Sequence, residues 1–88
     1  MEKIQTKVKR IIDGDTFIVN KKIHGTDRIR LAGINQPERY QFGGKKATNI
    51  LKGLIGGKRV TIIPVGRSYN RVVANVISNR KNITKRLK

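Results

Sequence analysis

The chain has 88 residues, enough for one compact domain with a thin core, since a domain of this size buries only about 60% of its unfolded surface. It contains no cysteine, which excludes a disulfide framework, a thiolate nucleophile and a zinc–thiolate site. Lysine and arginine number 21 against 5 acidic residues, a formal net charge of +16. This excess favours a polyanionic partner, and nucleic acid rather than an anionic membrane, which would require an amphipathic helix with bulky apolar anchors.

The first part of the chain predicts strands separated by short turns. Residues 3–12 alternate well enough for a strand, with Ile4, Val8 and Ile12 on one face. An Asp-Gly-Asp turn at 13–15 precedes a second strand over 16–19, and a hairpin turn around Gly25 occupies 21–26. Residues 27–32 predict a third strand, with Arg30 on its polar face. Residues 33–43 are irregular.

The second part predicts one clear helix. Apolar residues at i, i+3, i+4, i+7 and i+8 place it at 45–55, and two glycines at 56 and 57 end it. Residues 58–63 and 72–77 predict two further strands, the former ending before Pro64, and Asn82 can cap a short helix over 83–87.

This order of elements favours a mainly β (α+β) fold. We expect one domain, 1–88, built as a five-stranded OB-fold barrel with one helix between strands 3 and 4 and a short C-terminal helix. An isolated α+β sandwich is the alternative.

Acidic residues are rare, and three of the five lie in two predicted turn segments, 12–16 and 35–38. Calcium binds hard oxygen ligands such as carboxylates, amide oxygens, backbone carbonyls and water. Asp15, the side-chain oxygen of Asn35 and a nearby backbone carbonyl can supply part of such a shell. Ordinary turn chemistry explains the same residues without a metal, and both readings stay open on spacing alone.

Two arginines lie near these turns and can serve a phosphodiester. Attack on a phosphodiester builds negative charge on its oxygens, and fixed guanidinium groups stabilise that charge with paired hydrogen bonds. Arg30 and Arg71 are the candidates, although an arginine in so basic a chain is more often a solvated surface group.

Two motifs give the chain a recognisable pattern. Residues 10–17 (Arg-Ile-Ile-Asp-Gly-Asp-Thr-Phe) and residues 28–38 (Arg-Ile-Arg-Leu-Ala-Gly-Ile-Asn-Gln-Pro-Glu) together resemble the staphylococcal nuclease (thermonuclease-like) family. The similarity continues through 42–43, 51–55, 57–60 and 68–74, so it covers nearly the whole chain.

The resemblance implies an OB-fold barrel with calcium-dependent phosphodiesterase activity on DNA and RNA. It implies that Asp15 and Asn35 are metal ligands and that Gln36 contributes its backbone carbonyl. It also implies that Glu38 is the general base for the attacking water, that Arg30 and Arg71 bind the scissile phosphate, and that Tyr69 lies beside the bound nucleotide.

The chain departs from the family in two respects. The usual residue at position 35 is aspartate, and the neutral Asn35 removes one charge, which weakens calcium binding. Longer members also continue through further helices, so the chain resembles a minimal form or a fragment.

The basic residues near the two ends of the chain are expected to contact phosphates without reading sequence. They are Lys7, Lys9, Arg10, Arg80, Lys81, Lys85 and Arg86. Tyr69 can in addition stack on a base.

Three functions follow from these observations. The first is a calcium-assisted nuclease of low sequence specificity with a weakened metal site. The second is a non-catalytic basic OB-fold protein that binds DNA or RNA, and a protein-interaction module is a third, weaker reading. We expect a monomer that binds DNA or RNA, with no membrane partner and no small-molecule cofactor. An intracellular location is expected because no apolar run follows the N-terminus.

Overall fold

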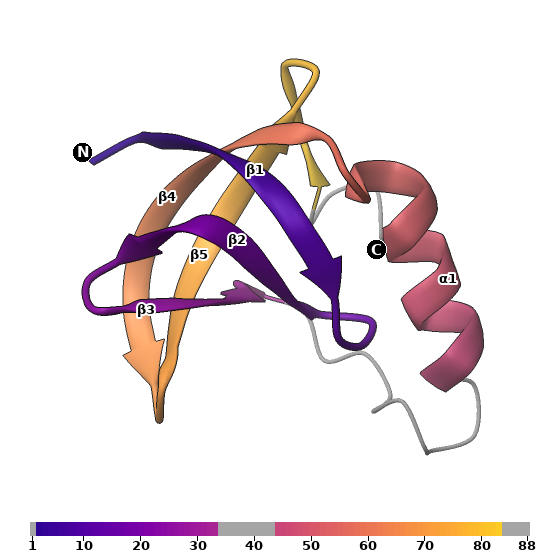
Figure 1. Cartoon of the computed structure of the whole chain (residues 1–88), viewed down its shortest axis with the longest axis horizontal. Helices are drawn as coiled ribbons and strands as arrows, with labels where there is room; N and C mark the ends of the chain where they lie inside the picture. Colours follow the sequence, from indigo (N-terminus) through magenta and orange to yellow (C-terminus); the bar gives the residue numbers. More distant parts are fainter. Residues whose placement is uncertain (1, 34–43, 84–88) are drawn as a thin grey trace.

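The computed structural model describes residues 2–33 and 44–83. In this part of the chain, β1 (Ile4–Ile11), β2 (Thr16–Ile23) and β3 (Thr26–Leu31) precede α1 (Gly44–Ile55). The helix is followed by β4 (Arg59–Ser68), β5 (Arg71–Ser78) and the two-residue β6 (Lys81–Asn82). Figure 1 shows the strands wrapped around one another, with α1 alongside the barrel that they form.

The sheet closes on itself. Its strand order is β3-β2-β1-β4-β5-β6, with every neighbouring pair antiparallel, and a parallel pairing of β3 with β5 joins the two sides. Five strands therefore form a closed barrel to which β6 is added at one edge. This arrangement confirms the predicted OB-type barrel with its helix between the third and fourth strands, and the open α+β sandwich is wrong.

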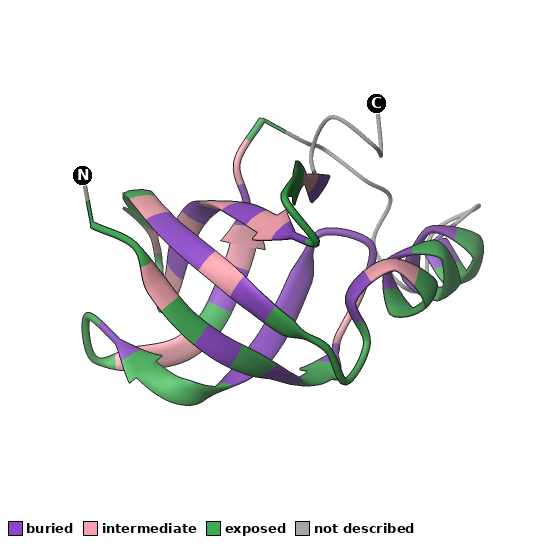
Figure 2. Cartoon of the chain, turned by 90° about the horizontal axis from the view of Figure 1, so that it is seen from above, coloured by how far each residue is buried: buried purple, intermediate pink, exposed green. Residues whose placement is uncertain are grey.

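Alternate residues of β1, β3 and β5 fill the barrel, as the alternating colours along strands in Figure 2 show, whereas β2 contributes four consecutive buried residues, 16–19. Phe17, Ile29 and Ile62 have no exposed surface, and α1 adds Leu51 and Ile55, which are equally buried. Burial of each such side chain stabilises the fold by about 1.5–3 kcal/mol. The helix therefore contributes to the same core as the barrel.

A bulge in β1 changes which isoleucine faces the core. The register with β2 shifts between Val8 and Arg10, so that Ile11 pairs with Phe17. Ile11 is buried and Ile12 is half-buried. The predicted face with Ile12 in the core is therefore wrong at its last position, because a bulge adds one residue and reverses the alternation after it.

Two strands are longer than predicted. β2 continues to Ile23, so the hairpin turn shrinks to His24 and Gly25. β4 continues through Pro64 to Ser68, whereas the prediction ended the strand before Pro64. Proline is tolerated there because β1 pairs with β4 only as far as Ile62, and the pairing of β4 with β5 shifts register between Pro64 and Gly66.

The segment after β5 also differs from the prediction. Asn82, expected as a helix cap, pairs with Ile77 in β6. The predicted helix at 83–87 falls almost wholly on residues outside the described ranges. Across those ranges, no helix is long and apolar enough to cross a bilayer.

The β5–β6 turn has a strained backbone. Asn79 and Arg80 have φ angles of 53° and 66°, in the left-handed region. They link the paired residues Ser78 and Lys81, as in the two-residue hairpin turns that favour Asn-Gly. Arginine is unfavourable in this conformation, whereas asparagine tolerates it.

The bulge can be tested with two alanine variants. We expect Ile11→Ala to lower the free energy of unfolding by about 2–4 kcal/mol, because it leaves a cavity in the core. Ile12→Ala should cost clearly less, since that side chain is only half-buried. Urea unfolding followed by circular dichroism measures both, and a larger loss for Ile12→Ala would contradict the register.

The strained turn predicts a stabilising substitution. Arg80→Gly should raise the free energy of unfolding by about 1 kcal/mol, since glycine has no side-chain penalty at positive φ. The same unfolding assay measures it, with Lys52→Ala on the exposed side of α1 as a charge-matched control. If the Arg80→Gly variant is less stable than the wild type, the backbone at Arg80 is not strained.

Candidate functional site

The loop between β1 and β2 fixes Asp15 at one end of the barrel. The backbone N–H groups of Ile12 and Asp13 both donate to the carbonyl of Thr16, at 2.9 and 3.2 Å, and close a tight turn. The N–H of Leu31 donates to the carbonyl of Asp15 at 2.8 Å. Asp15 is therefore held against β3 by its backbone and does not depend on its side chain for its place.

Asp15 is buried, with 8% exposure for the whole residue and 11% for its side chain, and its carboxylate faces groups of both signs. Its Oδ1 accepts a hydrogen bond from the Thr16 hydroxyl at 2.9 Å, and its Oδ2 lies 3.6 Å from Nη2 of Arg30. The N–H of Asp15 donates to Oδ1 of Asp13 at 3.4 Å, so a second carboxylate is adjacent. The structure thus brings together Asp15 and Arg30, two of the predicted site residues.

Burial raises the pKa of Asp15 above its ordinary value of 3.8, and the neighbouring Asp13 raises it further. The Thr16 hydroxyl and Arg30 act in the opposite direction but do not cancel the effect. The ionised carboxylate is therefore under-compensated in the folded protein. Carboxylate oxygens are the ligand type that hard divalent cations prefer, so Asp15 can supply one ligand to such an ion.

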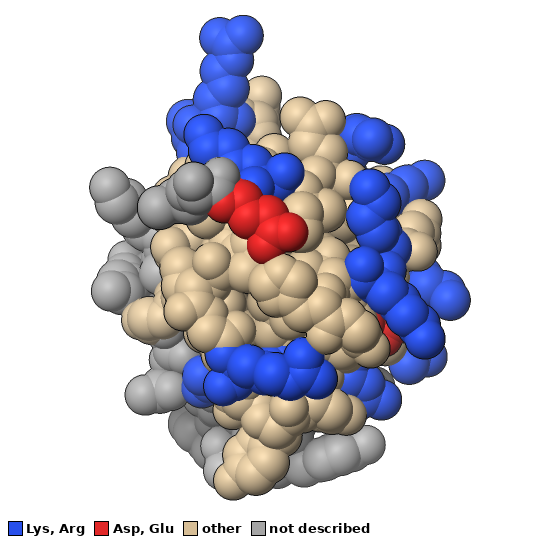
Figure 3. Space-filling model, turned by 90° about the vertical axis from the view of Figure 1, so that its left-hand side faces the viewer, with Lys and Arg blue, Asp and Glu red and all other residues tan. Residues whose placement is uncertain are grey.

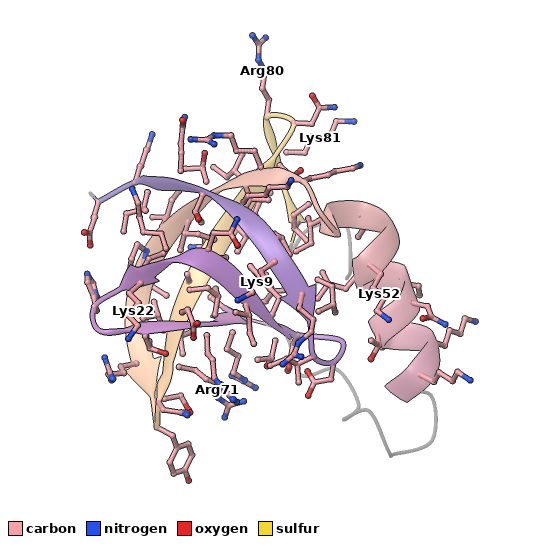
Figure 4. The ribbon with its side chains drawn as sticks, in the orientation of Figure 1. Lys9, Lys22, Lys52, Arg71, Arg80 and Lys81 are labelled. Carbon is pink, nitrogen blue, oxygen red and sulfur yellow. The ribbon has the colours of Figure 1, made fainter. Side chains whose placement is uncertain are left out.

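Arg30 and Arg71 lie on strands that are direct neighbours. Arg30 pairs with Val73, and Ile29 pairs with Val72, the residue after Arg71. The alternation of both strands turns Ile29 and Val72 into the core and leaves Arg30 and Arg71 half-exposed on the outer side. In Figure 4, the Arg71 side chain extends below β3 at this end of the barrel.

The β4–β5 turn presents Tyr69. Its side chain is 89% exposed and its φ angle is 56°. Arg67 holds the turn through Nε, which donates to the Tyr69 carbonyl at 3.3 Å, and through Nη1, which donates to the His24 carbonyl at 2.8 Å. The Thr26 hydroxyl donates to the Asn70 carbonyl at 2.7 Å. The β2–β3 and β4–β5 turns are therefore tied to one another.

Arg67, Thr26 and Thr16 support the site although no motif in the sequence assigns them a role there. Each acts through a hydrogen bond that positions a predicted site residue or its turn. The Thr16 contact has a local signal, because the hydroxyl follows the carboxylate directly in sequence. The Arg67–Tyr69 bond is also local, spanning two positions. The bonds from Thr26 to Asn70 and from Arg67 to His24 join residues more than forty positions apart, and no sequence spacing reveals them.

The predicted phosphate-contacting residues fall into separate groups. Lys7, Lys9 and Arg10 are exposed on β1, and Arg80 and Lys81 lie at the β5–β6 turn. Figure 3, which faces the side with the β2–β3 turn, shows lysine and arginine over wide areas and acidic groups over small ones. Lys85 and Arg86 lie outside the described residues.

Three predicted site residues, Asn35, Gln36 and Glu38, also lie outside the described residues. Within 2–33 and 44–83, no group of three or more histidine, cysteine, aspartate or glutamate side chains is placed to hold a metal ion. The described part of the candidate site is thus one buried carboxylate, its arginine partner, a neighbouring arginine and an exposed tyrosine at one end of the barrel.

Known proteins similar to this chain belong to one family or carry nuclease names. Residues 28–87 match the sequence pattern of a family described as "Staphylococcal nuclease homologue". An "Uncharacterized endonuclease" of Escherichia coli is 38% identical over 74 residues, which cover 83% of this chain and 48% of that protein. An "Uncharacterized endonuclease" of Haemophilus influenzae is 35% identical over 83 residues, which cover 93% of this chain and 47% of that protein.

A "Thermonuclease" of Staphylococcus intermedius is 42% identical over 62 residues, covering 62% of this chain and 36% of that protein. The chain thus spans about half the length of the first two relatives, at 48% and 47%.

The raised pKa of Asp15 predicts a pH-dependent effect of its neutralisation. In metal-free protein near neutral pH, Asp15→Asn should raise the free energy of unfolding, because asparagine can still accept from Thr16 and carries no buried charge. The gain should be full above the folded pKa and vanish below the ordinary value of 3.8, where aspartate is protonated in both states.

Urea unfolding with chelator at a series of pH values measures this difference. A destabilised Asp15→Asn at neutral pH would show that the Arg30 ion pair outweighs the burial of the charge.

Proposed function

Because the chain belongs to the staphylococcal nuclease homologue family, we propose that it hydrolyses phosphodiester bonds of DNA or RNA with low sequence specificity and calcium assistance. One observation carries the proposal. The buried Asp15 lies 3.6 Å from Arg30 on β3, and Arg71 lies on the neighbouring strand β5, two residues before Val73, the pairing partner of Arg30. A cation-binding carboxylate beside two phosphate-binding guanidinium groups is the combination that phosphodiester hydrolysis requires.

Asp15, the amide oxygen of Asn35 and the backbone carbonyl of Gln36 would hold the calcium ion. When bound, calcium polarises the phosphate and helps to orient the attacking water. The under-compensated charge of Asp15 supports this assignment, since a cation supplies the missing opposite charge. The neutral Asn35 makes the proposed site a weak one.

The protein's own groups supply the rest of the chemistry. Glu38 accepts a proton from the water as its oxygen bonds to phosphorus and the leaving oxygen departs. Arg30 and Arg71 donate hydrogen bonds to the non-bridging oxygens, where negative charge accumulates. Each guanidinium carries five N–H donors, so Arg30 can serve both Asp15 and a phosphate oxygen.

Binding would depend on the phosphate backbone. Exposed lysine and arginine side chains attract phosphates irrespective of base, which agrees with low sequence specificity. The exposed Tyr69 can stack on a base next to the reacting phosphate. A non-catalytic binding protein is the second candidate, supported by the net charge of +16 and by the neutral Asn35.

A cleavage assay on labelled single-stranded DNA tests the proposal. Arg30→Ala and Arg71→Ala should each lower kcat/KM by about 100- to 1000-fold, since each removes a donor to the developing charge. Glu38→Gln and excess chelator should abolish most cleavage. Lys52→Ala is the control, because it removes one exposed cation from α1, away from Arg71, and should cost far less.

The assay also separates the two candidates. Calcium-dependent cleavage that depends on Arg30, Arg71 and Glu38 supports the nuclease. Salt-sensitive binding without cleavage would leave the binding protein as the function, and unchanged cleavage by the Arg30 and Arg71 variants would refute their roles.

A further inference from the structure

A basic hollow lies on the outer side of β1, β4 and β5, away from Asp15. Its volume is about 280 Å³, and its lining residues are Gln5, Arg59, Val60, Thr61, Ile77, Asn79 and Arg80. These residues come from three neighbouring strands and from the β5–β6 turn. None of the residues that the proposed function uses for catalysis or metal binding lines it.

Strand pairing builds the hollow. Thr61 pairs with Gln5 on one side and with Ile77 on the other, so these three side chains form a continuous floor across the sheet. Arg59 pairs with Lys7 two positions further along the β1–β4 ladder, on the same face of the sheet as Thr61 and Gln5, which places two cationic residues at one border. Arg80 borders the hollow from the turn.

The charges of this hollow are not neutralised within the described part of the chain. No lining residue is acidic, and neither the Arg59 nor the Arg80 side chain has a carboxylate or hydrogen-bond partner among the described residues. Two guanidinium groups beside a polar floor suit an oxyanion such as a phosphodiester. Charge complementarity therefore favours nucleic acid as the occupant.

The backbone of the turn points to the same use. Arg80 is kept at a φ of 66°, where glycine would be more favourable. Strain retained by an exposed arginine is consistent with a role for its side chain that glycine cannot fill.

The hollow is too far from the candidate site to contact the same phosphate. Arg71 begins β5, and the turn that carries Arg80 follows its end. A strand rises by about 3.3 Å per residue, so the 8 residues of β5 separate the two arginines by roughly 25 Å. Figure 4 shows Arg71 and Arg80 at opposite ends of the barrel.

We propose that this hollow binds a backbone phosphate of a nucleic-acid strand remote from the phosphate that is cleaved. The proposal rests on the proposed function only for the nature of the ligand, and it adds a second anchoring point centred on Arg59 and Arg80. It implies that substrates long enough to reach both ends of the barrel bind more tightly than short ones. Because both anchors contact the backbone, the gain should not depend on base sequence.

The test compares oligonucleotides of two lengths with the double variant Arg59→Ala/Arg80→Gly. Affinities for labelled DNA of about 3 and about 30 nucleotides are measured by fluorescence anisotropy in chelator over a range of salt concentrations. The long strand should bind the variant about 10-fold more weakly, and the slope of log K against log salt should fall by about 1.4, or 0.7 for each lost contact to a single strand. The short strand should bind both proteins equally.

Lys52→Ala removes one charge from the exposed side of α1, away from both ends of β5, and should leave both affinities within about 2-fold of the wild type. The single Arg80→Gly variant should also bind the long strand more weakly although its turn is relieved of strain, so loss of folding cannot explain the result. Circular dichroism checks that the single variant Arg59→Ala keeps the fold of the wild type.

The outcomes distinguish this proposal from the proposed function. Weaker binding of the long strand only, in a protein that never cleaves, supports the second anchor and refutes the nuclease. If the double variant binds the long strand with the same affinity and salt slope as the wild type, the second anchor is overturned, whether or not cleavage occurs. The second anchor is also overturned if the double variant loses binding to anionic lipid vesicles but still binds DNA as the wild type does.

Discussion

Closure of the barrel by the parallel pairing of β3 with β5 is the constraint on which the candidate site depends. The pairs Ile29–Val72 and Leu31–Ala74 are completely buried and fix how far the two strands slide along one another. The N–H of Ala32 extends the closure by donating to the Ala74 carbonyl at 2.8 Å. Since side chains alternate along a strand, the same register leaves Arg30 and Arg71 together on the outer side.

The candidate site contrasts with the rest of the surface in its electrostatics. Within residues 2–33 and 44–83, most charges are exposed cations, whereas Asp15 is a buried anion with Asp13 beside it. Its position is held by backbone hydrogen bonds to β3, so the fold does not require the carboxylate for its architecture. The charged Asp15 carboxylate lowers the free energy of unfolding, and the backbone does not need it. Its presence is therefore more readily explained by a role in binding a ligand than by a role in stability.

The sequence predicted the elements that repeat regularly and failed where a single residue changes the pattern. Helix α1 and the barrel order follow from apolar spacing, and the burial of Phe17 and Ile29 agrees with it. The bulge in β1 could not be predicted, because alternation assumes a constant register and Ile11 and Ile12 are equally apolar. The continuation of β4 through Pro64 depends on where β1 stops pairing, which is a property of two strands together.

For the candidate site, the motif resemblance placed Asp15 and Arg30 in one site, but their 3.6 Å approach was not predicted. The burial of Asp15 and the support from Thr16 were not predicted either, because they depend on how the loop packs against β3. The tie from Arg67 and Thr26 to the opposite turn was equally hidden, since it forms only when distant hairpins meet. The roles of Asn35, Gln36 and Glu38 stay predictions.

The two hydrogen bonds between the hairpin turns have a consequence for the order of folding. Thr26 and Asn70 are 44 residues apart in sequence, and His24 and Arg67 are 43 apart, so each contact closes a long loop. Contacts of high sequence separation cost loop entropy before they contribute energy, and proteins dominated by them fold slowly. Arg30 and Arg71 likewise come to neighbouring strands only through the pairing of β3 with β5, two strands about forty residues apart in the sequence. Neither hairpin alone therefore holds the candidate site, which is a property of the closed barrel.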